Sequence, residues 1–254
     1  MKQRVTSAVI IGILTIACCY FGSWLFKIAL AFIGISATYE TIKIRKDKFN
    51  YLLFVIMLLS VIGIWVVNKH LISIILFEIV VLLTISVFDE KENLLDISYV
   101  LLMSIVVGFA LHYLDYVETY SKWMMGYVFI ICYLTDIFAL FTGMKFGKHK
   151  LNERISPKKT IEGAIGGWLF GFMFSLLWAS FFNFFGFKPY IIVISSLTLP
   201  IVSQIGDLVF SMIKRYFGVK DYSHLIPGHG GILDRFDSLI FSIIFLGALL
   251  SLLV

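Results

Sequence analysis

Long apolar blocks alternate with short polar breaks along the whole chain. A helix that crosses the hydrocarbon core of a membrane needs about 20 apolar residues, and most of the blocks have roughly that length. The polar or Gly- and Asn-containing breaks predict about nine membrane-spanning helices, over residues 5–22, 24–42, 50–67, 71–88, 97–114, 122–143, 161–183, 190–213 and 236–254. We therefore expect an all-α polytopic membrane protein.

Composition and length support this class. Of the 254 residues, 60% are hydrophobic and 15% are charged, a balance that a soluble domain of this size does not have. We expect one integral membrane unit, with N-terminal helices over 1–120 and a catalytic region over 121–254. The first apolar stretch imitates a signal peptide, but it continues to Thr38, so we expect it to be retained. The three cysteines lie in apolar runs without metal-ligand spacing and predict neither a zinc site nor disulfides.

The distribution of positive charge indicates which segments face the cytoplasm. With a cytoplasmic N-terminus, the inside segments hold 17 of the 21 Lys and Arg residues, and the outside turns hold Lys27, Lys69, Lys122 and Lys188. The sequence therefore predicts a multi-pass protein of the cell membrane whose polar segments face the cytoplasm. The net charge of +5 then reflects anionic lipid and anionic substrates, and we expect no nucleic acid partner.

The first long polar segment, 144–160, carries candidate substrate-binding residues. Ser156 followed by Pro157 predicts a helix start, where free backbone N–H groups favour phosphate. The candidates in this run are Ser156, Lys158, Lys159, Thr160 and Glu162.

Asp136, Glu40 and Glu78 fall inside the predicted spans, where an unpaired carboxylate is costly. Asp136 precedes the first polar segment, and we expect it to face a partner, a cation or a bound substrate, although pairing with Lys145 or Lys148 is the alternative. Glu40 and Glu78 sit in no polar constellation, so we expect each to be partnered within the protein or to reach toward the interface.

The second polar segment begins at the end of the eighth predicted span. Asp207, Ser211, Lys214 and Arg215 share one helix face, which presents a carboxylate, a hydroxyl and two cations within about two turns. Such a face suits a metal ion beside phosphate oxygens.

A glycine-rich loop follows and ends in two carboxylates at i, i+3 spacing. If the last helix begins at Asp234, then Asp234 and Asp237 both project from its first turn, while Gly228, Gly230 and Gly231 permit close backbone approach. We expect Asp207, Asp234 and Asp237 to hold Mg²⁺, which prefers such oxygen ligands, and a second divalent ion or a monovalent cation stays open. His229, beside the glycines, is a candidate for binding phosphate or moving a proton.

These residues resemble the signature of the phosphatidate cytidylyltransferase family, also called CDP-diglyceride synthases. The pattern Ser-x-x-Lys-Arg, four residues, Lys-Asp, then Pro-x-His-Gly-Gly-x-x-Asp-Arg-x-Asp runs from Ser211 to Asp237. The resemblance covers residues 130–254, about half of the chain, and includes Asp136, Gly206-Asp207 and the run from Ser156 to Gly163.

The resemblance implies a reaction in which phosphatidic acid and CTP give CDP-diacylglycerol and pyrophosphate. It implies catalytic roles for Asp207, Asp234, Lys214, Arg215, His229 and Arg235, and adds Lys220, Asp221, Gly230, Gly231 and Ser211 to the substrate-binding candidates. A phosphate monoester is already anionic at neutral pH, so positioning and charge stabilisation suffice and no strong base is needed. The resemblance also suggests a homodimer.

Two other functions stay open on the sequence. One is a CTP-dependent lipid-alcohol kinase, which shares metal and phosphate chemistry but releases CDP. The other is a cation-coupled transporter built on the intramembrane acids, although the acids gather at one face rather than at the midplane of inverted repeats.

Overall fold

Apolar helices form most of the structure. It is a computed structural model and describes residues 23–45, 49–67, 69–182, 188–226 and 230–253. This part of the chain forms eight helices, which confirms the all-α class, and one short two-stranded hairpin that the sequence did not predict. The predicted span over 5–22 lies outside the described residues. The helices are α2 (Ser23–Lys43), α3 (Tyr51–Val66), α4 (Leu71–Phe88), α5 (Leu94–Tyr120), α6 (Lys122–Phe146), α7 (Ile161–Phe181), α8 (Pro189–Tyr216) and α9 (Leu233–Leu253).

Seven of the described helices are long and apolar enough to cross a membrane, and α3, with 16 residues, is shorter. The chain is therefore a multi-pass membrane protein. Helix α3 begins where its sequence supplies a cap, since the side chain of Asn50 accepts hydrogen bonds from the backbone N–H groups of Leu52 (2.9 Å) and Leu53 (3.3 Å).

The chain divides into two compact units. The first contains Met1–Tyr116 and Asp221–Arg235, and the second contains Val117–Lys220 and Phe236–Val254. The second polar segment is thus shared between the units, with Asp207 in one and Asp234 in the other.

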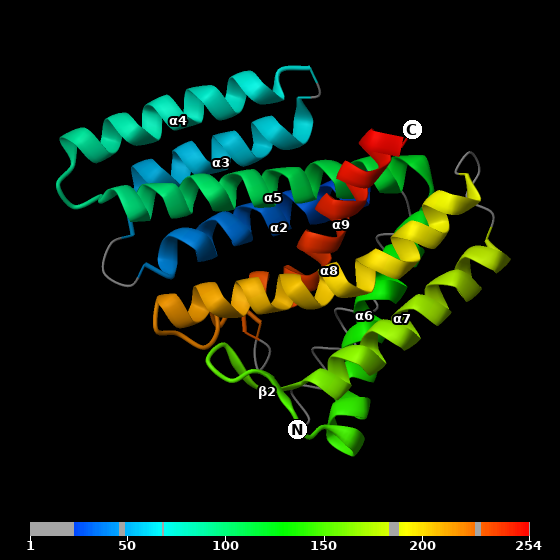
Figure 1. The fold of residues 1–254 in the computed structure, drawn as a ribbon. Helices are drawn as coiled ribbons and strands as arrows, with labels where there is room; N and C mark the ends of the chain where they lie inside the picture. The colour runs from blue at the N-terminus through cyan, green and yellow to red at the C-terminus, as the bar shows by residue number, and fades with distance from the viewer. Residues whose placement is uncertain (1–22, 46–48, 68, 183–187, 227–229, 254) are drawn as a thin grey trace. The chain divides into compact units, whose positions relative to one another are not determined.

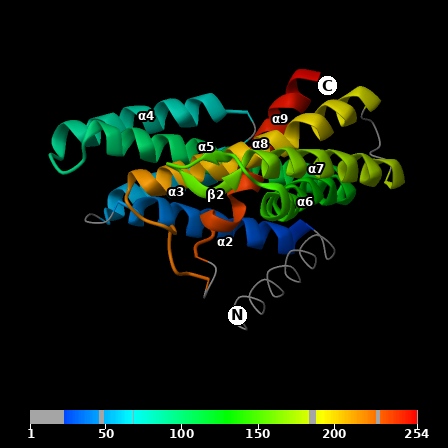
Figure 2. The same ribbon diagram turned by 60° about the horizontal axis from the view of Figure 1, so that its bottom comes forward.

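In the first unit, helices α2 to α5 run alongside one another (Figure 1; Figure 2). Glycines allow close contact there, because a Cβ atom on Gly34 would lie 2.8 Å from the Leu111 side chain and one on Gly108 would lie 2.9 Å from Ile64. These contacts join α5 to α2 and α3, so the first unit is a closely packed helical layer.

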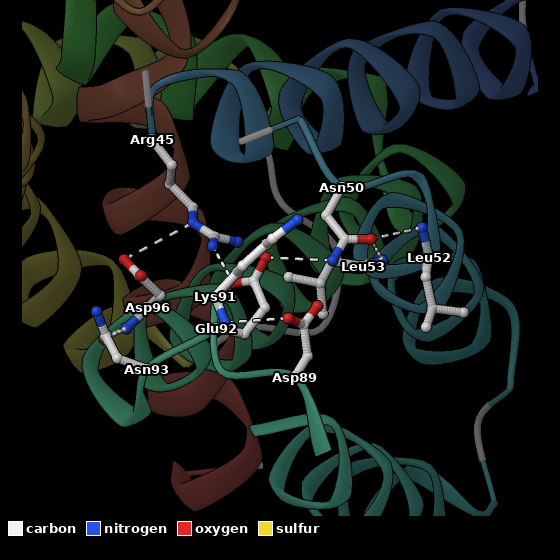
Figure 3. A network of polar contacts seen from close by, with 9 residues as sticks. All are labelled: Arg45, Asn50, Leu52, Leu53, Asp89, Lys91, Glu92, Asn93 and Asp96. Atoms are coloured by element: carbon white, nitrogen blue, oxygen red, sulfur yellow. Dashed lines mark hydrogen bonds and ion pairs between the residues drawn. The ribbon is translucent and has the colours of Figure 1, made fainter. Parts of the chain in front are cut away.

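A buried ionic network joins the end of α2 to the turn between α4 and α5 (Figure 3). Arg45 forms an ion pair with Glu92 and lies 3.7 Å from an oxygen of Asp96, and Asn50 donates to the other Glu92 oxygen at 3.2 Å. The Arg45 and Glu92 side chains are only 2% and 1% exposed, so each needs the other as a partner. The network fixes the C-terminal end of α2 within the first unit.

In the second unit, α6 packs along α7, and both helices contact α8. The face of α7 toward α6 carries small residues every fourth position, namely Gly163, Gly167, Gly171 and Ser175, and all four are buried. A Cβ atom on Gly167 would lie 2.6 Å from the backbone oxygen of Thr135 on α6. Small residues at this spacing let two helix backbones approach within a membrane, where van der Waals packing drives association.

We predict that Gly167→Val separates α6 from α7, because the added side chain has no space against the Thr135 backbone. The thermal unfolding temperature of the detergent-purified protein should fall by several degrees, as expected for overpacking that costs about 1–3 kcal/mol. Ser180→Val, which adds bulk at an exposed position of the same helix, is the matched control. Equal effects of the two substitutions would contradict the packing assignment.

Candidate active site

The first polar segment forms a hairpin between α6 and α7. Strand β1 (Lys150–Asn152) pairs antiparallel with β2 (Ser156–Thr160), so the predicted helix start at Ser156 is wrong. Helix α7 begins at Ile161 instead, because the Thr160 side chain accepts a hydrogen bond from the N–H of Gly163 at 3.1 Å and serves as the N-cap. The cap signal is therefore real but belongs to Thr160, and pairing with β1 keeps Ser156 and Pro157 extended.

Glu162, in the first turn of α7, ties the hairpin's entry to that helix. Its carboxylate accepts backbone hydrogen bonds from Lys148 (3.1 Å) and His149 (3.2 Å), and it lies 2.6 Å from the His149 ring nitrogen Nδ1. The side chain predicted to bind substrate thus already has several partners within the protein. Lys158, by contrast, is exposed on β2.

Three carboxyl groups gather inside the second unit, from α6, α8 and α9. Asp136, Asp207 and Asp237 lie close enough to act on one another electrostatically. The hydroxyl of Ser238 lies 3.2 Å from an oxygen of Asp136 and 3.2 Å from an oxygen of Asp237, and the Ser238 N–H donates to Asp237 at 2.8 Å. One serine therefore joins two of the three acids, and the sequence analysis did not single it out although it adjoins Asp237.

Gly206 explains how Asp207 comes close to α9. A Cβ atom at Gly206 would lie 2.7 Å from the Cβ of Phe241 and 2.9 Å from the backbone oxygen of Asp237. Only a glycine lets α8 approach α9 so closely. Gly206 thus allows the close contact between α8 and α9, and this contact brings the neighbouring Asp207 near α9.

Two lysines face the acid cluster. Lys159, the fourth residue of β2, forms an ion pair with Asp207 at 2.5 Å, and the electrostatic influence of the buried Lys214 reaches Asp237. Ser211 donates to Asp207 at 3.3 Å, as their spacing on one helix face predicts. The guanidinium of Arg215 turns elsewhere, toward the carbonyls of Ile155 (3.4 Å) and Val219 (2.9 Å).

In the first unit, the glycine-rich loop is closed by Asp234. Oxygen Oδ2 of Asp234 accepts hydrogen bonds from the backbone N–H groups of Tyr222 (2.8 Å) and Gly231 (2.9 Å). Gly230 has a φ of 84°, a conformation that other residues rarely adopt, and its backbone bridges to Ile226. Asp234 therefore shapes the loop around it, whatever else it binds.

Glu40 has partners, as expected, but the expectation that it sits in no polar constellation is wrong. Its buried carboxylate accepts hydrogen bonds from Ser223, Ile232 and Leu233, all of the signature segment. Its partners lie more than 180 residues away in the sequence, so no local pattern could reveal them. Glu78 is also buried, beside the hydroxyls of Ser60 and Ser104 on neighbouring helices, so it too has partners within the protein.

The other predicted site residues lie in different parts of the chain. His229 and Gly228 lie outside the described residues. Lys220 is exposed at the end of the second unit, whereas Asp221 and Arg235 belong to the first unit. Within the described ranges, no group of three or more His, Cys, Asp or Glu side chains has the arrangement of a metal site.

We predict that Ser238→Ala destabilises the second unit by about 1–3 kcal/mol, the cost of removing a partner from buried polar groups. Chemical or thermal unfolding of the purified protein measures this. Ser242→Ala is the control, because Ser242 is a buried serine one turn further along α9 whose hydroxyl bonds to the backbone oxygen of Ser238 in the same helix. If the two variants lose equal stability, Ser238 has no special role between the acids.

Comparison with known proteins assigns the chain to a family. Residues 2–253 match the model of the cytidylyltransferase family. A phosphatidate cytidylyltransferase of Bacillus subtilis (strain 168) is 33% identical over 99% of this chain and 98% of its own length, and one of Staphylococcus aureus (strain COL) is 35% identical over 98% and 99%. One of Staphylococcus haemolyticus (strain JCSC1435) is 37% identical over 78% of this chain and 76% of its own. Because the match extends over nearly the whole chain, the protein belongs to the cytidylyltransferase family.

Proposed function

We infer that the protein is a phosphatidate cytidylyltransferase, which transfers the cytidylyl group of CTP to phosphatidic acid and yields CDP-diacylglycerol and pyrophosphate. The observation that carries this is the similarity, over 98% or more of both chains, to relatives that bear this name. The signature from Ser211 to Asp237, present without a gap, agrees with it.

The chemistry suits the residues of the second unit. In the reaction, an oxygen of the lipid phosphate forms a bond to the α-phosphorus of CTP, and the bond from that phosphorus to pyrophosphate breaks. Both substrates are polyanions, so the protein must offer cations that neutralise them. Lys159 and Lys214 beside the acid cluster, and the exposed Lys158 on the same strand as Lys159, are suited to that task.

In the first unit, the start of α9 offers a cation to a phosphate. Arg235 lies in the first turn of α9 and is exposed, directly after the loop that Glu40 and Asp234 hold in shape. We assign Arg235 and the loop to substrate binding, with His229, Lys220 and Asp221 as neighbouring candidates along the chain.

We further propose that the reaction uses Mg²⁺. The donor set fits this ion, since Asp207 and Asp237 offer only oxygen and act on each other electrostatically within one unit. Bound there, the ion would supply neutralisation of the charge on the reacting phosphates. Asp207 and Asp237 would hold the ion, and Lys159, which pairs with Asp207 in the structure, would be available to a phosphate. A share of Asp234 in the same site, a second divalent ion and a monovalent cation stay predictions from the sequence.

We propose that the polar segments face the cytoplasm, where CTP is available. The asymmetry of Lys and Arg between alternate loops supports this orientation, and the helices would keep the acyl chains of the lipid in the bilayer. Association into a homodimer is part of the same proposal and rests on the family resemblance alone.

The first test is conversion of labelled CTP and phosphatidic acid to CDP-diacylglycerol by the purified protein with Mg²⁺, comparing wild type with Asp207→Asn. We predict that Asp207→Asn lowers kcat by about 10²-fold or more, because the variant loses a charged ligand and leaves Lys159 without its partner. Asp207 is substituted rather than Asp234, because the Asp234 carboxylate also accepts backbone hydrogen bonds that shape the loop, and its loss would change structure as well as charge.

Asp89→Asn is the control for that test. Asp89 lies in the turn between α4 and α5 and accepts a hydrogen bond from the N–H of Lys91, so the same change of side chain should leave the rate close to wild type. Products decide between functions: CDP-lipid with pyrophosphate supports the proposal, whereas CDP with a phosphorylated alcohol would mean a kinase. Consumption of neither nucleotide nor lipid by folded wild-type protein would favour the transporter.

A further inference from the structure

Glu40, in the last turn of α2, contacts the part of the signature segment that belongs to the first unit. Oxygen Oε1 of Glu40 accepts a hydrogen bond from the Ser223 hydroxyl at 2.6 Å and from the N–H of Ile232 at 2.8 Å. Oxygen Oε2 accepts one from the N–H of Leu233 at 2.8 Å. Glu40 is fully buried, so these donors replace the water that the carboxylate gives up.

The second glycine of the signature makes this contact feasible. A Cβ atom on Gly231 would collide with both carboxylate oxygens of Glu40, reaching Oε2 at 2.6 Å. The N–H of Gly231 meanwhile donates to Asp234. The segment Gly231–Asp234 is therefore held between two carboxylates, Glu40 on one side and Asp234 at the start of its own helix.

The bound N–H groups are those that a helix start leaves without partners. Leu233 is the first residue of α9, and Ile232 directly precedes it, so Glu40 supplies from another helix the acceptor that an N-cap side chain usually supplies locally. A negative charge at a helix N-terminus is also favourable. Glu40 thus determines where α9 begins, and with it the position of Asp234 and Arg235.

Glu40 itself is held in place. The Arg45 network of Figure 3 fixes the C-terminal end of α2 to the turn between α4 and α5, five residues beyond Glu40. The carboxylate is consequently presented from a rigid base rather than from a free helix end.

We propose that Glu40 is a positioning residue for cytidylyl transfer, which holds residues 231–235 at the start of α9 in the shape in which they bind the triphosphate of CTP. This rests on the proposed function. The sequence places Glu40 far from every motif residue, and its action is through the backbone of residues 231–233 rather than on the substrate.

The test compares Glu40→Gln with Glu78→Gln. Glutamine keeps the size of Glu40, but its amide places an N–H₂ against one of the N–H donors and removes the charge. Glu78 is the matched control, a second buried glutamate of the same unit, which lies beside Ser60 and Ser104. In Glu40→Gln we expect kcat to fall about tenfold or more and the KM for CTP to rise, whereas a mere loss of folded enzyme lowers only the apparent kcat.

Hydrogen exchange measured by mass spectrometry gives a readout independent of activity. The amides of Ile232 and Leu233 should exchange faster in Glu40→Gln, with the peptides of α3 and α4 unchanged. Gly231→Ala should produce the same local change from the other side of the contact. Wild-type exchange and wild-type KM in Glu40→Gln, or the same losses in Glu78→Gln, would overturn the proposal.

If Glu40→Gln does not fold, Ser223→Ala takes its place, because it removes one of the three donors and leaves the carboxylate. It should raise the KM for CTP by a smaller factor, and no change in either KM or exchange would then overturn the proposal. If wild type makes no CDP-lipid, the proposed function is wrong. The exchange data would still test whether Glu40 holds the backbone of residues 231–233.

Discussion

A carboxylate inside a membrane-spanning helix needs hydrogen-bond donors from the protein, because the hydrocarbon around it offers none. Much of this structure follows from that requirement. Glu40 obtains donors from the segment before α9, and Asp136 and Asp237 share the hydroxyl of Ser238. Each of these contacts consequently joins elements that are distant in the sequence: α2 to the start of α9 in the first unit, and α6 to α9 in the second.

Glycine is the counterpart of these acids, since each close approach requires a position without a side chain. Gly206 lets α8 meet α9 beside Asp237, and Gly231 makes room for the Glu40 carboxylate. In the sequence, the glycines of the signature indicate only that the backbone can be approached closely. In this protein, Gly230 and Gly231 lie against the chain's own carboxylates, Asp234 and Glu40, so they are needed for the shape of the loop before any substrate is bound.

The sequence predicts what depends on local length and polarity. The bounds of α4 agree with the predicted span over 71–88, because apolar length alone decides them. Ser156 was misassigned since a cap signal cannot reveal that its strand pairs with residues 150–152. The spacing of Gly163, Gly167 and Gly171 could have revealed the close packing of α6 and α7. Nothing local could have joined Glu40 to Leu233 or Asp136 to Ser238, because these contacts exist only in the folded chain.

In the second unit, the positive charge of Lys159 is balanced by the negative charge of Asp207. Lys159 and Asp207 satisfy each other in the structure, which spares both the cost of standing unpaired beside a membrane. Under the proposed function, a phosphate-bearing substrate would offer Lys159 a second acceptor, and Asp207 would then need another cation as its partner. A nucleoside triphosphate accompanied by a divalent ion would bring both charges together, so the ion pair would open without leaving either residue unpaired.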